Sequence, residues 1–116
     1  MKDNVIVQKS LAFSVRIVNL HKYLNGQKKE HVISKQICKS GTSIGANIAE
    51  SQQAQSRADF LSKLEIALKE TSETKYWLRL LNATDYLSKT EFDSMYADCS
   101  EIEKLLVSII KSTKKI

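Results

Sequence analysis

Apolar residues recur every three or four positions along most of the chain, which is the spacing of amphipathic helices. In the first such segment, Phe13, Ile17, Leu20 and Leu24 form one apolar stripe. Comparable stripes follow in three later segments. The pattern predicts helices over residues 4–24, 30–53, 57–82 and 90–112.

The first predicted helix carries more apolar residues than one helix pair needs. Leu11, Val15 and Val18 lie beside the main stripe and widen it. Asn25-Gly26 is a typical helix stop, so a short loop is expected to lead into the second helix.

The second predicted helix contains a strip of small residues. Gly41, Gly45 and Ala49 are four residues apart, so they share one face of a helix. A glycine inside a helix lowers helix stability by about 1 kcal/mol relative to alanine. Two of the three glycines of the chain nevertheless lie in this predicted helix. We expect another helix to approach this strip too closely for a Cβ atom.

The third and fourth helices have heptad-like apolar seams and clear start signals. The centre of the third seam is Thr71 and Thr74, whose hydroxyls either bond back to the preceding turn or contact a neighbouring helix. Ser56 with Asp59 is the expected start of the third helix. The fourth starts with either Ser88 and Glu91 or Thr90 and Asp93 as its cap. The seam residues are Phe60, Leu64, Ala67, Thr71, Thr74, Leu78 and Leu81, followed by Phe92, Met95, Cys99, Ile102, Leu106 and Ile109.

Four long helices with three short connections predict an all-α protein, an antiparallel up-down-up-down four-helix bundle that forms one domain over residues 1–116. The absence of proline and the low glycine count argue against a turn-rich β protein. No export signal begins the chain and no apolar run is long enough for a transmembrane span, so we expect a cytoplasmic protein with no membrane contact. Cys38 and Cys99 are then buried free thiols.

The sequence predicts no catalytic residue, no metal site and no cofactor. A di-iron bundle needs two Glu-x-x-His pairs, but neither His21 nor His31 has a glutamate three residues before it. The segment from Gly41 to Gly45 lacks the Lys-Ser/Thr of a phosphate-binding loop. An enzyme is therefore not expected.

The net charge of +5 comes entirely from the first half of the chain: residues 1–54 hold eight basic and three acidic residues. Lys28, Lys35 and Lys39 are predicted on one face of the second helix, and Lys9 and Arg16 on one face of the first. Such a surface can neutralise several phosphates of a nucleic acid. The alternative is an ordinary solvated face.

Two adjacent aromatic residues, Tyr76 and Trp77, cannot both point into one core. One of them is a candidate for a subunit interface.

With these residues in place, the chain resembles the four-helix proteins encoded by intervening sequences within bacterial 23S ribosomal RNA genes. The resemblance covers about residues 8–110. It rests on short motifs in the first three helices: Phe13, Arg16-Ile17-Val18, Ser43-Ile44-Gly45-Ala46-Asn47-Ile48-Ala49-Glu50, Arg57, Phe60, Glu70-Thr71, Glu73-Thr74 and Tyr76-Trp77-Leu78. The glycine typical after the alanine-glutamate pair is Ser51 here.

The resemblance implies an antiparallel bundle that assembles into a homopentamer. The chain is also similar to the accessory variability protein of diversity-generating retroelements, a basic pentamer that binds nucleic acid and a reverse transcriptase. Neither group supplies an enzymatic site to compare.

Two functions follow as hypotheses. The first is a non-enzymatic oligomeric accessory protein that binds structured RNA or DNA through Lys9, Arg16, Lys28, Lys35 and Lys39. The second is a protein-interaction scaffold that binds no nucleic acid and whose basic charge is incidental. Under either hypothesis a reverse transcriptase or another protein is a candidate partner.

Overall fold

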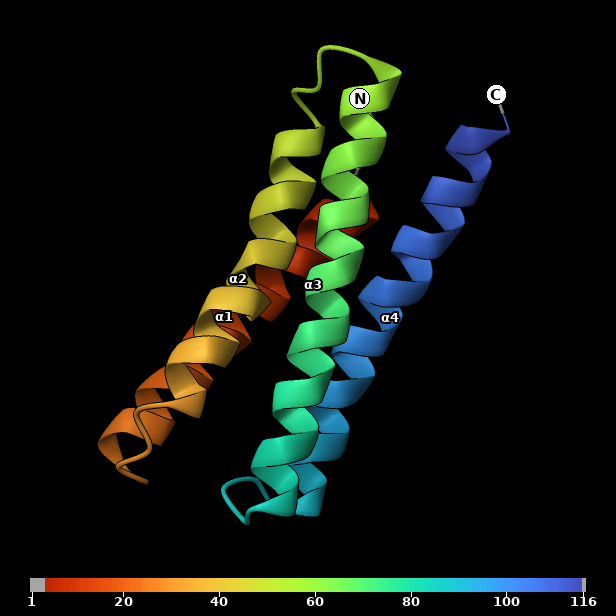
Figure 1. Ribbon diagram of the computed structural model, residues 1–116. Coiled ribbons are helices and arrows are strands. Elements are labelled where there is room, and N and C mark those ends of the chain that lie inside the picture. The colour runs from red at the N-terminus through yellow and green to blue at the C-terminus, as the bar shows by residue number, and fades with distance from the viewer. Residues whose placement is uncertain (1–3, 116) are drawn as a thin grey trace.

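The computed structural model describes residues 4–115 as four helices packed side by side, with extents of 46 × 22 × 20 Å (Figure 1). The predicted domain also includes residues 1–3 and 116, which lie outside the described residues. Residues 1–3 are also part of the amino-terminal segment in which no export signal was found. The helices are α1 (Val5–Gly26), α2 (Ile33–Ser51), α3 (Arg57–Ala83) and α4 (Lys89–Lys114). No strand occurs in the described part, and the all-α class is confirmed.

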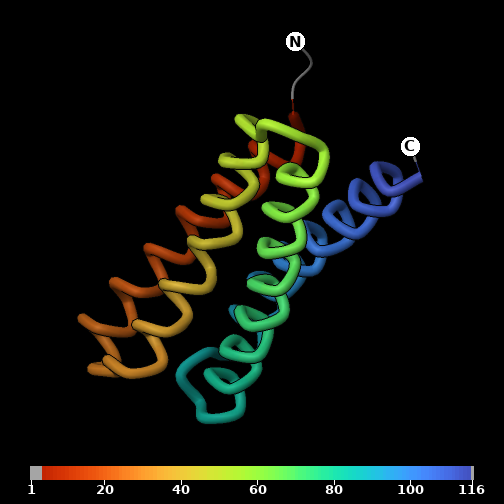
Figure 2. Tube along the Cα trace, turned by 45° about the horizontal axis from the view of Figure 1, so that its top comes forward, coloured from red at the N-terminus to blue at the C-terminus, as the bar shows by residue number. Residues whose placement is uncertain are grey.

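Each helix packs on two neighbours, in the cyclic order α1–α2–α3–α4 and back to α1. The contact between α1 and α4 is the least extensive of the four. In Figure 1 the chain reverses direction at each of the three connections, and in Figure 2 the carboxyl end of α4 extends away from α1 and α2.

The predicted apolar stripes form the core. Phe13, Ile17, Leu20 and Leu24 of α1 are all buried, and so are Ile37, Ile44 and Ile48 of α2 and most of the seam residues of α3 and α4. The last turns of α4 differ from the prediction, because Ile110 is buried and Ile109 only half-buried.

The hydroxyls of the α3 seam use both of the expected arrangements. Thr71 donates to the carbonyl of Leu68 one turn earlier, at 2.6 Å. Thr74 instead lies 2.9 Å from the hydroxyl of Ser40, so this pair joins α3 to α2 inside the core. Both threonines are fully buried, and the hydrogen bonds offset the cost of placing their oxygens there.

The boundary between α1 and α2 was predicted incorrectly. α1 continues through Gly26, and the residue with a left-handed backbone is Lys29, with φ of 56°. α2 starts at Ile33, not residue 30, because the carboxylate of Glu30 accepts hydrogen bonds from the backbone amides of Val32, Ile33 and Ser34 at 3.1, 2.9 and 2.7 Å. Glu30 therefore caps α2 from outside the helix.

The other helix ends lie close to the predicted ones. α2 stops at Ser51, two residues early, since the amides of Gln52 and Gln53 bond to carbonyls three residues back. Ser56 caps α3 by accepting from the Asp59 amide at 3.0 Å. α4 begins at Lys89 with a full capping box between Ser88 and Glu91, so this pair and not Thr90 with Asp93 forms the cap.

Candidate nucleic-acid interface

Two of the predicted phosphate contacts, Lys9 and Arg16, form ion pairs inside the molecule. Lys9 lies 3.1 Å from Glu101, and Arg16 lies 2.6 Å from Asp98 and also donates to the Ser94 hydroxyl at 3.0 Å. All of these partners belong to α4. The two basic residues thus link α1 to α4, and a phosphate would have to compete with carboxylates for them.

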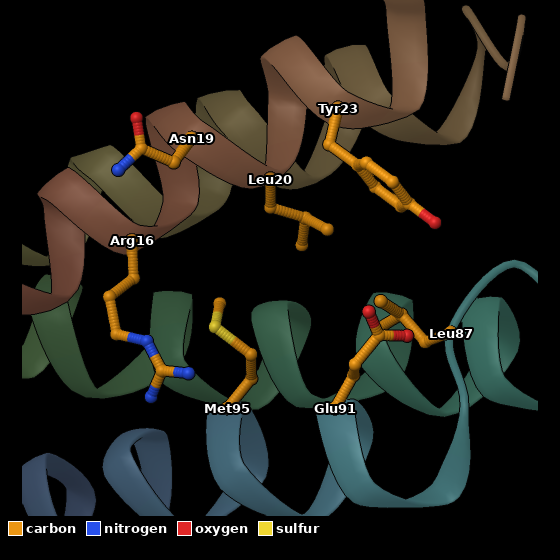
Figure 3. A pocket seen from close by; sticks show the side chains of 7 residues that line it. All are labelled: Arg16, Asn19, Leu20, Tyr23, Leu87, Glu91 and Met95. Carbon is orange, nitrogen blue, oxygen red and sulfur yellow. The ribbon is translucent and has the colours of Figure 1, made fainter. Parts of the chain in front are cut away.

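Figure 3 shows how Arg16 reaches across the space between α1 and α4. Leu20 from α1 and Met95 from α4 point into the same space and line it with apolar atoms. Near its other end Tyr23 extends from α1 and Glu91 from α4. The space is therefore an open pocket at the α1–α4 seam, and the Arg16 guanidinium that crosses it is already paired with Asp98.

The other three predicted contacts are exposed. Lys35 and Lys39 lie on α2, whereas Lys28 lies in the α1–α2 connection and not on the helix as expected. Within residues 4–115 no ion pair holds any of the three. The ammonium of Lys28 is 5.9 Å from the ring centre of Tyr23.

Two of these lysines affect the pKa values of nearby acidic residues. The pKa of the Glu91 carboxyl is lowered chiefly by its hydrogen bonds with Ser88, with a smaller contribution from Lys28. The pKa of Glu70 is raised by burial and by Glu73, and Lys39 opposes that change. Lys28 and Lys39 are thus partly balanced by carboxylates.

The structure adds two lysines that the sequence reasoning missed. Lys22 on α1 and Lys29 in the connection are exposed, and no ion pair among the described residues involves either. They were missed because only residues sharing a face of one predicted helix were grouped. The available signal was the Lys28-Lys29 pair itself, six residues after Lys22.

We call the five exposed lysines between positions 22 and 39 the basic end; it consists of Lys22, Lys28, Lys29, Lys35 and Lys39, which lie in the α1–α2 connection and on the adjoining turns of both helices. The one acidic residue between positions 22 and 39 is Glu30, which is only 8% exposed and turns its carboxylate toward the α2 backbone. The basic end therefore has five positive charges in a short stretch of chain, and the only carboxylate of that stretch is directed away from solvent.

The amino end of α2 is not itself an anion site. Amides at a helix start can hold a phosphate, but here the Glu30 carboxylate already accepts from three of them. The only Phe, Tyr or Trp residue between positions 22 and 39, Tyr23, is half-buried and lies under Lys28. The chemistry of the basic end is consequently lysine to phosphate, without base stacking.

The small-residue strip faces α1. A Cβ atom on Gly41 would lie 2.8 Å from two side-chain atoms of Ile17, and one on Gly45 would lie 2.8 Å from the Ser14 hydroxyl and 3.2 Å from the Ser10 carbonyl. Ala49 lies beyond this contact and is exposed. It lines an outer groove between α1 and α2 together with Val7, Leu11 and Ala46.

The residues that widen the α1 stripe are exposed. Leu11 is 66%, Val15 54% and Val18 38% accessible, so they contribute nothing to the core of one chain. Tyr76 on α3 is also half-exposed. Its neighbour Trp77 packs against the core and donates to Glu73 at 3.1 Å, and the two rings meet edge to face at 5.1 Å.

No group of three or more potential metal ligands occurs in the part of the chain that the structure describes. Cys38 is half-buried and Cys99 fully buried, both as free thiols. Burial raises the pKa of the Cys99 thiol to about 12, which disfavours the reactive thiolate. Among the helices of residues 4–115, none has the length and apolarity needed to cross a membrane.

Comparison with known proteins identifies the family. The model of the 23S rRNA-intervening sequence protein family matches residues 2–108. A crystal structure of a protein of unknown function from the S23 ribosomal protein family of Bacteroides thetaiotaomicron VPI-5482 is 62% identical, with a TM-score of 0.93 over 96% of this chain and 99% of that one. No curated protein matches. The resemblance predicted from the helix motifs is confirmed, and the chain belongs to the 23S rRNA-intervening sequence protein family.

Proposed function

We propose that this protein is a non-enzymatic accessory protein that binds structured RNA or duplex DNA through phosphate contacts at its basic end. The observation that carries the proposal is the group of five exposed lysines, with Glu30 directed into the protein. Lys9 and Arg16 are secondary, because both already pair with α4.

The unit of this function is an antiparallel up-down-up-down bundle, assembled as a homo-oligomer, with a pentamer as the expected size. Two observations support assembly. Leu11, Val15 and Val18 form an exposed apolar stripe along α1, and Tyr76 exposes half of its surface on α3. A ring of such units would repeat the basic end several times, and linked weak contacts bind far more tightly than one alone.

Salt dependence is the test of phosphate binding. Each lysine that neutralises a phosphate of duplex DNA contributes about −0.9 to the slope of log K against log salt, so five contacts give a slope of about −4 to −5 per chain. The affinity for a structured RNA hairpin and for duplex DNA is measured by gel shift over a salt series.

Charge reversal locates the contact. Replacing Lys28 and Lys35 by glutamate should reduce affinity at least about tenfold and make the slope shallower by about 2. The matched control reverses Lys69 and Lys115, which are exposed outside the basic end. Absence of binding at low salt, or equal losses in both double variants, would contradict the proposal.

The second candidate is a protein-interaction scaffold without nucleic-acid binding. The exposed stripe of Leu11, Val15 and Val18 favours it, because apolar side chains on a surface mark protein contacts rather than phosphate contacts. This function predicts partner binding that is insensitive to charge reversal at the basic end.

A further inference from the structure

The outer surface has a groove between α3 and the carboxyl-terminal half of α4. Leu68 and Ser72 of α3 line one side, and Lys104, Val107 and Lys111 of α4 line the other. In Figures 1 and 2 the carboxyl end of α4 and the α1–α2 connection lie at opposite ends of the molecule. A partner in this groove would leave Lys28 and Lys29 in the α1–α2 connection uncovered.

The floor of the groove is apolar. Leu68 and Val107 are both half-buried, so each presents part of its side chain to the groove. A phosphate backbone makes no favourable contact with an apolar floor. An apolar side chain of a protein partner that covers it removes apolar surface from water, which favours binding. No aromatic residue lines the groove, so stacked bases have no platform either.

The rim of the groove is positively charged. Lys104 and Lys111 are exposed, and no ion pair within residues 4–115 includes them. The one carboxylate of the groove, Glu103, lies 2.8 Å from the Lys75 ammonium and is neutralised there. The two rim lysines are seven residues apart, which is about 10 Å along a helix.

The rim also carries two hydroxyls, of Ser72 and Ser108. Both serines are exposed, and neither hydroxyl makes a hydrogen bond to another described residue. Each can therefore donate to a carboxylate of an incoming segment.

We propose that the α3–α4 groove binds an acidic amphipathic helix of a partner protein. Two acidic residues seven apart on that helix match Lys104 and Lys111, and an apolar residue between them covers Leu68 and Val107. This inference goes beyond nucleic-acid binding and does not depend on it. The protein would then have two binding surfaces, the basic end for nucleic acid and the α3–α4 groove for a partner protein.

The probe is a fluorescent peptide of about 20 residues, long enough to form helix in isolation. It has glutamates seven residues apart and leucines between them on the same face. One control peptide replaces the leucines by alanine, and another replaces the glutamates by lysine. Fluorescence anisotropy with the full chain should show binding of the first peptide and much weaker binding of both controls.

Two double variants of equal charge then localise the contact. Reversing Lys104 and Lys111 to glutamate should weaken peptide binding about tenfold or more, and reversing Lys22 and Lys35 should leave it unchanged. All four side chains are exposed, so both variants should fold, which circular dichroism checks.

Each of the following results would overturn the groove proposal: no peptide binding, equal peptide binding by the variant changed at Lys104 and Lys111, or a loss of oligonucleotide affinity in that variant in place of peptide affinity. A fall in the molecular mass of that variant in light scattering would also overturn it, because the groove would then be a contact between copies of this chain. Failure of oligonucleotide binding to respond to Lys22 and Lys35 contradicts only the function of the basic end.

Discussion

Gly41 of α2 packs directly against Ile17 of α1, with no room for a methyl group between them. The Ile17 side chain is completely buried, so it cannot turn away from a new methyl group at position 41 without moving other core atoms. Gly45 has a softer neighbour, the Ser14 hydroxyl, although the Ser10 carbonyl also lies 3.2 Å from the Cβ position. Both glycines lower the intrinsic stability of α2 as a helix. In return, their lack of a side chain allows α1 and α2 to pack closely.

Gly41→Ala should therefore destabilise the protein although alanine favours helix. Overpacking costs about 1–3 kcal/mol, and the propensity gain returns about 1 kcal/mol, which leaves a net loss of about 1 kcal/mol. Gly26→Ala is the control, because nothing lies within 4 Å of its Cβ position and it should not destabilise. Urea unfolding measures both, and a Gly41→Ala protein as stable as the parent would refute the close contact.

At the scale of elements, capping side chains define where α2, α3 and α4 begin, and the apolar faces define how these helices pack. α3 and α4 have serine caps one residue before the helix, as their sequences predict. α2 is different, because its cap is a glutamate three residues upstream that only the fold of the α1–α2 connection brings to the helix start.

Glu30→Ala should cost about 2 kcal/mol, since three amides at the start of α2 lose a charged acceptor. Glu30→Gln keeps an acceptor oxygen and should lose less. Urea unfolding at neutral pH compares them with Glu101→Ala, which breaks only the exposed pair with Lys9 and should cost less than about 1 kcal/mol. A loss at Glu30 no larger than at Glu101 would contradict the capping role.

The capping box of α4 gives a pH dependence. Because the pKa of Glu91 is lowered in the folded protein, its carboxylate adds stability at pH values above its ordinary 4.5, and that stability is lost as the pH falls through the folded pKa. Glu91→Gln should thus be less stable than the parent at pH 7, with the difference shrinking toward pH 3. Thermal unfolding over this range tests it; a difference that grows in acid would have the wrong sign.

At the scale of the whole molecule, the basic end and the exposed stripe of Leu11, Val15 and Val18 are surface features that the core of a single chain does not use, as is the α3–α4 groove. Isolated exposed apolar residues are common, but three on one face of α1 beside an apolar groove are typical of a contact surface.

Light scattering tests the proposed assembly. The parent should have a mass near five times 13.1 kDa, and replacing Leu11 and Val15 by glutamate should reduce it to that of one chain. Neither side chain belongs to the core, so the variant should stay helical. A parent that scatters as a monomer would contradict the oligomer, whatever the variant does.

The sequence by itself determined the helices and most of the core. The spacing of Phe13, Ile17 and Leu20 places all three on one face of a helix, and that face is buried. Ser56 and Ser88 mark the starts of α3 and α4. Both features can be predicted from sequence because each depends only on residues a few positions apart. The family motifs in α2 and α3 were also readable.

Only the tertiary structure decided which charges are available. Lys9 and Arg16 looked equivalent to Lys35 in sequence, but their carboxylate partners on α4 are more than 80 residues away in the chain. Likewise, the sequence predicted Glu30 as the first residue of a helix. In the structure Lys29 has a left-handed backbone, Glu30 lies before the helix, and its carboxylate caps the α2 amides. Periodicity describes one helix at a time, whereas the basic end depends on which side chains the packed helices bring together or neutralise.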